Sequence, residues 1–300
     1  MRLGLCCVFK QADIKFRRAT ARYLEKFSRA EQLERLGEIC LANAVSLKKA
    51  LVFCRGKGIG AFRINSQILP LKTHPNVGYG IEELPAGDLI VESFLDCGRF
   101  SRTNDIRTSF HPDQFIVLSS PNQDVVKRSL ADLAYQAEVA VWVGADVINI
   151  HGGGVYGDKP SALERLTREI RQLPRPVAER LTLENDDRSY TPEDLLPVCH
   201  KTGIPLVYDV HHHRCLKDGL TIGQATRSAL ATWNREPLFH VSSPLNGWSG
   251  PDTRKHHDFI DPDDFPETWS DLEITVEVEA KAKELAVLNL MEQLEQRSLS

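Results

Sequence analysis

The sequence predicts a single (β/α)8 barrel, and three observations indicate this fold. Short apolar runs alternate with longer stretches of helical pattern along the chain, as they do in repeated βαβ units. The runs number eight and recur at roughly thirty to forty residues, a spacing that favours a closed barrel over an open sheet. Residues with metal-ligand chemistry end most of the runs, where the reactive groups of such barrels lie.

The eight short runs are the predicted strands, because parallel strands that are covered on both faces are apolar throughout. They span residues 3–8, 61–64, 108–110, 147–150, 181–183, 206–208, 238–241 and 274–278. Two helix starts carry capping signals: Asp124 is an acidic N-cap candidate, and Thr191 precedes Pro192 at the first helical position. The predicted helices span residues 30–51, 88–102, 124–143, 159–173, 192–200, 221–232 and 281–296.

The composition predicts one intracellular domain. Three hundred residues with 42% apolar content can bury one large core. Lys10 ends the N-terminal apolar run too early for a signal peptide, and no stretch approaches the ~18 apolar residues of a membrane helix. We expect a barrel over residues 1–290, a loose tail over 291–300, a cytoplasmic location and neither a membrane nor an obligate protein partner. The seven cysteines lack CxxC spacing, so we expect them to be reduced.

A local basic segment contrasts with the net charge of −4, which argues against a surface coated in positive charge for nonspecific nucleic-acid binding. Segment 10–29 contains seven positive and two negative side chains. Its positive residues include Lys15, Arg17, Arg18 and Arg22, and Phe16, Tyr23 and Phe27 are interleaved with them. Charge runs are usually solvated, so the pattern alone leaves a solvated loop and a nucleic-acid contact both open.

Histidines and carboxylates gather at the ends of the predicted strands, where imidazole and carboxylate can hold Zn, Mn or Fe. Nine of the ten histidines lie at a strand end or in the loop after it, and only His200 stands apart. One catalytic zinc needs about three protein ligands, so eight candidates are enough for two or three ions. The candidate ligands are His111, His151, Glu184, Asp209, His212, His240, His257 and Glu279.

Glu184 is the central candidate, because a bare carboxylate at the end of a buried strand costs on the order of several kcal/mol. A structural ion pair with a barrel arginine is one interpretation. Histidines 111 and 151 on the preceding strands, and the acidic loop that follows, favour a carboxylate that bridges two ions. Asp209 and His212 are spaced to reach neighbouring ions across a tight turn, and His74 is a candidate to bind metal, orient water or hold phosphate. Multinuclear clusters of this kind suit phosphodiester cleavage.

Five ordered motifs closely resemble the UV damage endonuclease family. They are Phe110-His111-Pro112-Asp113-Gln114-Phe115, His151-Gly152-Gly153-Gly154-Val155-Tyr156-Gly157, Leu183-Glu184-Asn185-Asp186-Asp187, Asp209-Val210-His211-His212 and Val278-Glu279-Ala280-Lys281. The resemblance extends over essentially the whole chain. It implies a TIM barrel similar to endonuclease IV that nicks double-stranded DNA immediately 5′ to a UV photoproduct, a cyclobutane dimer or a 6-4 product. It also implies two or three divalent ions, with Mn²⁺ expected and with Zn²⁺, Mg²⁺ or Co²⁺ as possible substitutes.

The resemblance also implies roles for individual residues. One ion would take His111, His151 and Glu184; a second would take Glu184, Asp209, His240 and Glu279; a third would take His212 and His257. Glu184, Asp209 and His74 would act in catalysis. Gln114 and Phe115 match a pair that probes the damaged step. Lys15, Arg17, Arg18 and Arg22 would lie on the catalytic face and neutralise DNA phosphates, while the aromatic residues between them stack on bases.

Four departures from the family pattern concern lesion recognition. Family members often have Tyr and Asn where this chain has Leu5 and Phe9, and some have a lysine at the position of Leu238. The probe aromatic is Phe115 in place of Tyr. These changes spare the principal ligands and leave a shifted lesion preference open. The sequence also leaves open a sugar isomerase of the xylose-isomerase kind and a damaged-DNA-binding protein that has lost turnover.

Overall fold

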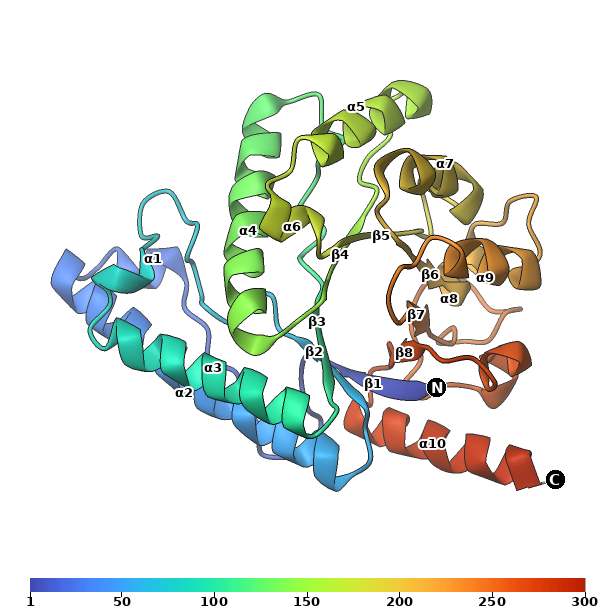
Figure 1. Ribbon diagram of the computed structural model, residues 1–300, viewed down its shortest axis with the longest axis horizontal. Coiled ribbons are helices and arrows are strands. Elements are labelled where there is room, and N and C mark those ends of the chain that lie inside the picture. The colour runs from blue at the N-terminus through green and yellow to red at the C-terminus, as the bar shows by residue number, and fades with distance from the viewer. Residues whose placement is uncertain (300) are drawn as a thin grey trace.

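Eight parallel strands close into a barrel in chain order, with β1 paired to β8, and helices surround it (Figure 1). The computed structural model describes residues 1–299, and the side chains of residues 1–297. The strands are β1 (Arg2–Cys6), β2 (Ala61–Ile64), β3 (Arg107–Phe110), β4 (Val147–His151), β5 (Leu181–Glu184), β6 (Leu206–Asp209), β7 (Leu238–Val241) and β8 (Thr275–Val278). The predicted (β/α)8 barrel is confirmed, and each predicted strand is present within two residues of its expected ends.

The helices follow the predicted order, with short additions. They are α1 (Ala21–Leu24), α2 (Arg29–Gly56), α3 (Gly87–Thr103), α4 (Gln123–Val143), α5 (Lys159–Arg171), α6 (Arg175–Ala178), α7 (Pro192–Thr202), α8 (Val210–Cys215), α9 (Ile222–Leu230) and α10 (Glu284–Leu299). Helix α7 begins as predicted, because the Thr191 side chain accepts from the Asp194 amide and Pro192 occupies the first turn. Helix α2 has a reciprocal capping box between Ser28 and Glu31.

Three local predictions were wrong. Helix α4 is capped by Asn122 instead of Asp124, because the Asn122 side chain reaches the Asp124 amide. The histidine triplet 211–213, expected in a loop, forms α8, because the Asp209 side chain accepts from the His212 amide and starts a helical turn. The last helix begins at Glu284 instead of residue 281, after Lys283 takes a positive φ of 56°.

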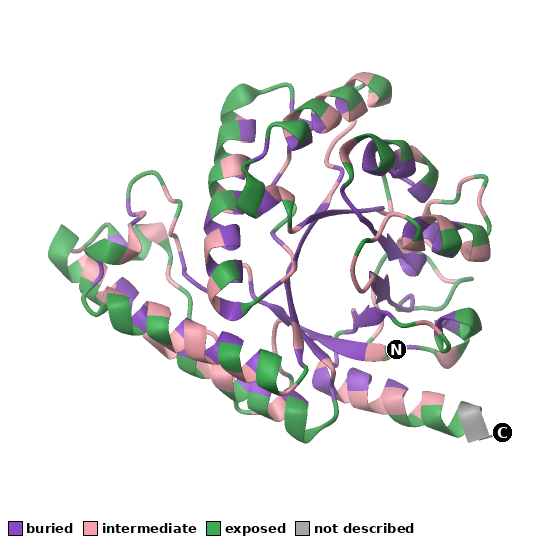
Figure 2. Cartoon of the chain, in the orientation of Figure 1, coloured by how far each residue is buried: buried purple, intermediate pink, exposed green. Residues whose placement is uncertain are grey.

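The interior of the barrel is apolar in one part and polar in another. Figure 2 shows the strands as buried along almost their whole length, with exposed residues on the outer helix surfaces. Val147, Val207 and Leu238 form a small buried apolar cluster, with Trp233 against it. Arg63 and Glu277 are nevertheless buried on β2 and β8 and form an ion pair with each other. A buried charge network therefore occupies part of the space within the strands.

The C-terminal segment continues the barrel's outer layer. Helix α10 runs to Leu299, and Met291 and Leu294 pack against the core, whereas Ser300 of the predicted tail lies outside the described residues. No helix within residues 1–299 has both the length and the apolar character needed to cross a membrane. All seven cysteines are free thiols.

Candidate metal centre

The strand ends bring seven of the eight predicted ligands together at one rim. His151, Glu184 and Asp209 are the last residues of β4, β5 and β6, and His111 and Glu279 follow directly on β3 and β8. His240 lies within β7, and His212 is placed by α8 immediately after β6. Because parallel strands all end at the same face, residues far apart in sequence meet there.

Three overlapping groups of side chains have the geometry to hold metal ions, each with its ligand atoms within 4.8 Å of one another. Glu184 and His111 each belong to two groups, so neighbouring ions could share them. The groups are His111 with His151 and Glu184; Glu184 with Asp209 and His212; and His111 with His240 and Glu279. The arrangement could hold more than one ion, the number that the count of ligands predicts.

Glu184 lies at the middle of this cluster. Its Oε2 is 2.9 Å from His111 Nε2, while its Oε1 is 3.2 Å from His240 Nδ1 and 3.3 Å from His212 Nδ1. The residue is fully buried, and its closest cationic partners are histidines instead of the barrel arginine considered from the sequence. A carboxylate with both oxygens turned toward imidazoles is suited to bridging.

The electrostatics of the cluster keep its carboxylates ionised. Burial opposes the charge on Glu184, but the neighbouring imidazoles of His240, His151 and His111 outweigh burial and hold its pKa well below the usual value. Burial also opposes the charge on Glu279, whose pKa the Arg63 guanidinium and His240 lower well below its usual value. Both carboxylates are therefore available as anionic ligands at neutral pH.

The pKa values of the histidines in the cluster shift in opposite directions. Burial alone would lower the pKa of His212 and His240, but the carboxylates of Asp209 and Glu184 outweigh burial and raise both values well above the ordinary histidine pKa. For His151 burial dominates and lowers the pKa, which favours the neutral imidazole that a metal requires.

Unpartnered buried atoms indicate that the site fits metal ions. Such atoms are costly in a protein interior unless a ligand or ion satisfies them. In the described chain Glu184 Oε1, Asp209 Oδ2, His151 Nδ1 and His240 Nδ1 are buried without a hydrogen bond. These atoms belong to oxygen and imidazole donors, the set that divalent transition ions accept.

Two asparagines that the sequence analysis did not single out hold the ligands in place. Asn149 donates to Glu184 Oε2 from the neighbouring strand. The Asn185 side chain accepts from the Asp209 amide and donates to its carbonyl, and the Asn185 carbonyl lies 3.0 Å from His212 Nδ1. The Asn185-Asp186 sequence after Glu184 was part of a recognised motif, but neither residue had an assigned role.

The eighth predicted ligand, His257, has its Nδ1 engaged by its own loop. Its Nδ1 accepts a hydrogen bond of 3.0 Å from the Phe259 amide, and it belongs to none of the three groups found within the described chain. The adjacent His256 faces the site instead, with its Nδ1 3.8 Å from Glu279 Oε2 and its ring centroid 6.3 Å from that of His212.

The residues expected to probe DNA lie on loops at the same face. Gln114 and Phe115 follow β3, and Phe115 is 74% exposed. Phe115 and His74 line one cavity of about 270 Å³. His74 Nδ1 accepts from the amides of Asn76 and Val77, and His74 is in none of the candidate ion groups of the described residues.

The basic segment after β1 is firmly anchored and exposed. Its backbone amides at positions 10, 11 and 12 donate to the Glu284 carboxylate, and the Asn43 side chain bonds the backbone of Arg17 in both directions. Its four proposed phosphate contacts, Lys15, Arg17, Arg18 and Arg22, are all exposed. The segment therefore presents positive charge from a fixed backbone.

Most of the segment's aromatic residues are packed and do not present free faces for base stacking. Phe16 stacks on Phe62, and Phe27 lies under the Arg35 guanidinium at 3.9 Å. Tyr23 is the exception, at 45% exposed. At the positions that depart from the family, Leu5 is fully buried and Phe9 packs on Phe53 and Phe62.

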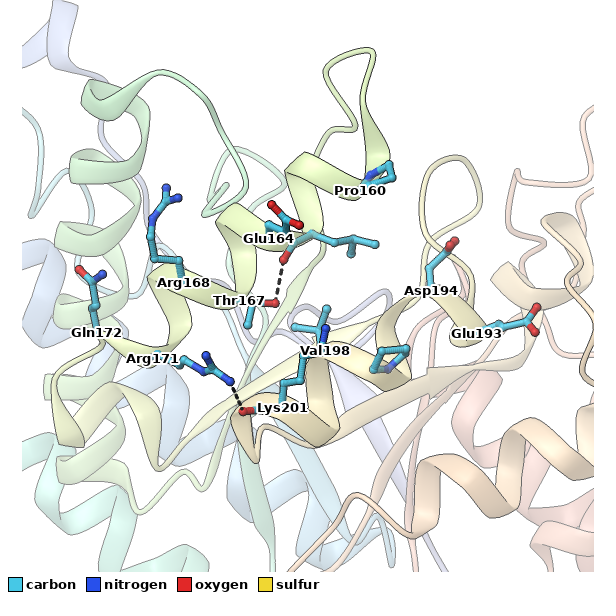
Figure 3. A pocket seen from close by; sticks show the side chains of 12 residues that line it. Pro160, Glu164, Thr167, Arg168, Arg171, Gln172, Glu193, Asp194, Val198 and Lys201 are labelled. Carbon is cyan, nitrogen blue, oxygen red and sulfur yellow. Dashed lines mark hydrogen bonds between the residues drawn. The ribbon is translucent and has the colours of Figure 1, made fainter.

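A larger surface cavity, of about 820 Å³, lies away from the ligands between α5 and α7 (Figure 3). Its walls carry both signs of charge, including Arg168, Arg171, Glu164 and Glu193. None of the candidate metal ligands lines it, so this cavity is separate from the strand-end cluster.

Two known proteins are similar to this chain over most of its length. A relative from Bacillus velezensis named UV DNA damage endonuclease is 36% identical over 290 residues, covering 91% of this chain and 87% of its own length. The crystal structure of SacUVDE superimposes with a TM-score of 0.88 at 28% identity and covers 99% of both chains.

More distant structures show the fold alone. Endonuclease IV from Thermus thermophilus has a TM-score of 0.61 at 15% identity, with 99% of this chain and 100% of that chain covered. D-psicose 3-epimerase from Clostridium cellulolyticum has a TM-score of 0.60 at 14% identity, with 99% and 98% covered. A barrel of this shape therefore does not by itself distinguish a nuclease from a sugar epimerase.

The family model decides between these classes, because it matches sequence over the whole barrel instead of shape. The model described as UV-endonuclease UvdE matches residues 1–299. Taken with the relative at 36% identity, this match shows that the chain belongs to the UV-endonuclease UvdE family and is an endonuclease of UV-damage DNA repair.

Proposed function

We propose that the enzyme nicks double-stranded DNA immediately 5′ to UV photoproducts, cyclobutane dimers and 6-4 products, using two or three divalent ions held at the strand ends. Mn²⁺ is the ion that the family resemblance implies, and the donor set of carboxylates and imidazoles also accepts Zn²⁺, Mg²⁺ or Co²⁺. The observation that carries the proposal is the set of three overlapping ligand groups, which share Glu184 and His111.

The first ion follows one of these groups, and the other two follow the division that the family resemblance implies. His111, His151 and Glu184 hold one ion. A second takes Glu184, Asp209, His240 and Glu279, and His111 is close enough to His240 and Glu279 to contribute. His212 belongs to the third ion together with His256, which replaces His257 because its ring faces Glu279. Ions bound here would lower the pKa of the attacking water and neutralise charge on the phosphate oxygens.

The protein's own residues position the substrate. The fixed basic segment binds phosphates through Lys15, Arg17, Arg18 and Arg22, and these contacts set the register of the duplex without reading sequence. Phe115, exposed beside Gln114, fills the space that a damaged base pair leaves in the stack. His74 shares the cavity beside Phe115, which favours a phosphate contact over metal ligation.

Cleavage of a defined duplex tests the proposal. A duplex carrying one cyclobutane dimer and a 5′ label is incubated with the protein and Mn²⁺, and the product is sized on a sequencing gel. We expect one nick, immediately 5′ to the dimer, which a chelator abolishes and which an undamaged duplex does not show. Intact damaged DNA in the presence of Mn²⁺, Mg²⁺, Zn²⁺ and Co²⁺ would contradict the proposal, and binding without cleavage would favour a damaged-DNA-binding protein.

A further inference from the structure

Glu277 is a buried carboxylate on β8 that lies beside the metal centre but belongs to none of the ion groups found in the described chain. It is only 1% exposed, and it stands directly across from His240 in the β7–β8 register. The residues on either side of it, Val276 and Val278, belong to the apolar core. Burying a charged side chain at this position has a desolvation cost that interactions with its partners must offset.

The partners of Glu277 come from three other strands. Ser109 on β3 donates a hydrogen bond to its Oε1. Its Oε2 lies 3.3 Å from Arg63 Nη1 on β2 and 3.1 Å from His240 Nε2 on β7. The same Arg63 nitrogen donates to Glu279 Oε1 at 2.6 Å, so one guanidinium is shared by Glu277 and a proposed metal ligand.

The two ring nitrogens of His240 face different groups. Nδ1 lies 3.2 Å from Glu184 Oε1 and 3.5 Å from Glu279 Oε1, among the candidate ligands. Nε2 faces away from them, toward Glu277. If His240 binds an ion, Nδ1 is the nitrogen that can do so, and the ring must then carry its proton on Nε2.

We propose that Glu277 is a positioning residue of the metal centre: when an ion is bound, Glu277 Oε2 accepts the Nε2–H of His240, so that the Nδ1 lone pair is directed at the ion. In the metal-free protein the two atoms are 3.1 Å apart and form an ion-pair contact, not a hydrogen bond. Metal-bound histidines commonly donate their other N–H to a carboxylate, which fixes both the tautomer and the ring orientation. Arg63 holds the Glu277 carboxylate in place and links it to Glu279. This inference rests on the proposed metal centre and assigns a role to a residue outside it.

A purely structural ion pair does not explain the arrangement as well. Arg63 already has a short hydrogen bond to Glu279, so Glu277 adds a second buried negative charge to a single guanidinium. Glu277 contacts His240, whose other ring nitrogen faces Glu184 and Asp209, where bound cations would balance the negative charge. A side chain whose only task was to neutralise Arg63 would not need to contact His240.

Metal affinity in the absence of DNA tests the inference. Glu277→Gln keeps the size of the side chain but removes its charge, and the end that replaces Oε2 faces both Arg63 and His240. An NH₂ group there would donate to His240 Nε2 and favour the wrong tautomer, whereas an oxygen there would hold the correct tautomer less strongly than a carboxylate does. We expect the variant to bind Mn²⁺ about 10- to 100-fold more weakly in a chelator competition, the range typical of a lost partner to a ligating histidine. Cleavage should recover when Mn²⁺ is raised to saturation, because the ligands themselves are intact.

Two further variants separate positioning from general stability. Glu236→Gln is the matched control: Glu236 is also ion-paired to an arginine, Arg2, and bonds Thr275, but it precedes β7 at the other end of the barrel. It should lower thermal stability without changing Mn²⁺ affinity. Ser109→Ala loosens Glu277 while keeping its charge, and should weaken Mn²⁺ binding in the same direction by a smaller factor. If Glu277→Gln does not fold, the Mn²⁺ affinity of Ser109→Ala tests the inference in its place.

The tautomer provides a readout that a structural role would not change. In protein loaded with diamagnetic Zn²⁺ and labelled with ¹⁵N-histidine, the His240 signals, assigned with His240→Gln, should show Nε2 protonated and Nδ1 bound. Three results would overturn the inference while leaving the proposed metal centre in place. They are an unchanged Mn²⁺ affinity in Glu277→Gln, an equal loss of Mn²⁺ affinity in Glu236→Gln, and Nε2 as the His240 nitrogen that binds the ion. Wild-type protein that binds no divalent ion would overturn both.

Discussion

His111, which follows β3, and Glu184, the last residue of β5, lie 73 positions apart in the sequence but are in direct contact, with His111 Nε2 2.9 Å from Glu184 Oε2. Each of the two residues belongs to two of the three candidate ion groups. The contact therefore joins the groups into one centre, and changes at either residue should affect more than one ion.

Substitution of Glu184 by Gln should abolish cleavage while leaving much of the DNA affinity. The amide removes a negative charge that is expected to bridge ions, whereas the phosphate contacts of the basic segment remain. Nicking of the dimer-containing duplex and binding by fluorescence anisotropy measure the two properties. Glu164→Gln, an exposed change at the outer cavity, is the control and should behave as wild type. Full activity in Glu184→Gln would refute the bridging assignment.

Substitutions of the adjacent residues His256 and His257 should differ in their effect on cleavage. His256→Ala should lower cleavage at limiting Mn²⁺, because this imidazole faces Glu279 and His212. His257→Ala should have a small effect on cleavage, because its ring bonds the Phe259 amide. Rates as a function of Mn²⁺ concentration compare the pair. The reverse order of effects would restore His257 as the ligand.

The stabilisation by metal should increase with pH. In the folded, metal-free protein the neighbouring carboxylates raise the pKa of His212 and His240, against the effect of burial. The ion pairs of the charged histidines therefore stabilise the fold fully below the unfolded pKa of about 6.5. This stabilisation is lost as the pH rises through the raised folded pKa values. A bound ion requires neutral imidazoles and must displace these protons, each at a cost of up to about tenfold in affinity per pH unit.

We therefore expect the rise in Tm on adding Mn²⁺ to be small near pH 6 and clearly larger near pH 8. Differential scanning calorimetry with and without the ion measures it. His212→Gln and His240→Gln should each reduce the pH dependence. An equal rise in Tm at both pH values would show that these protons are not displaced.

Removal of Arg17 and Arg18 together should weaken binding to damaged and undamaged duplexes alike. Each lost phosphate contact should reduce the slope of log affinity against log salt by about 1. Titrations at several salt concentrations give the slope. Arg175→Ala on α6 removes an equally exposed arginine, paired with Glu179, away from the strand-end face and should leave the slope unchanged. A loss confined to the damaged duplex would instead indicate lesion readout.

Phe115→Ala should reduce preference for damaged DNA. An aromatic side chain stacked on a base is worth about 1–3 kcal/mol, which corresponds to roughly 5- to 150-fold in affinity. Competition between dimer-containing and intact duplexes measures the preference. Val141→Ala trims another exposed apolar side chain, on α4, and should have no effect. Retained discrimination in Phe115→Ala would remove Phe115 from the recognition step.

Much of the fold and the site was determined by the sequence itself. The eight apolar runs predicted the closed barrel, because a parallel strand covered on both faces must be apolar along its length. The ligands at the ends of these runs were identified because the strand-end position, which is readable from sequence, fixes the face of the barrel to which each side chain belongs. As that rule requires, the ligand atoms of Glu184, His111 and His151 lie within 4.8 Å of one another.

Only the tertiary structure decided the contacts that depend on side-chain direction and on pairing across strands. His256 and His257 are neighbours of the same type, and the path of their loop determines which one faces Glu279. Glu277 ended no strand and matched no ligand motif, and its importance appears only when β8 closes against β7 and places it beside His240. Sequence specifies where strands end, but barrel closure determines which buried side chains touch, because partners such as Arg63 and Glu277 lie more than two hundred positions apart.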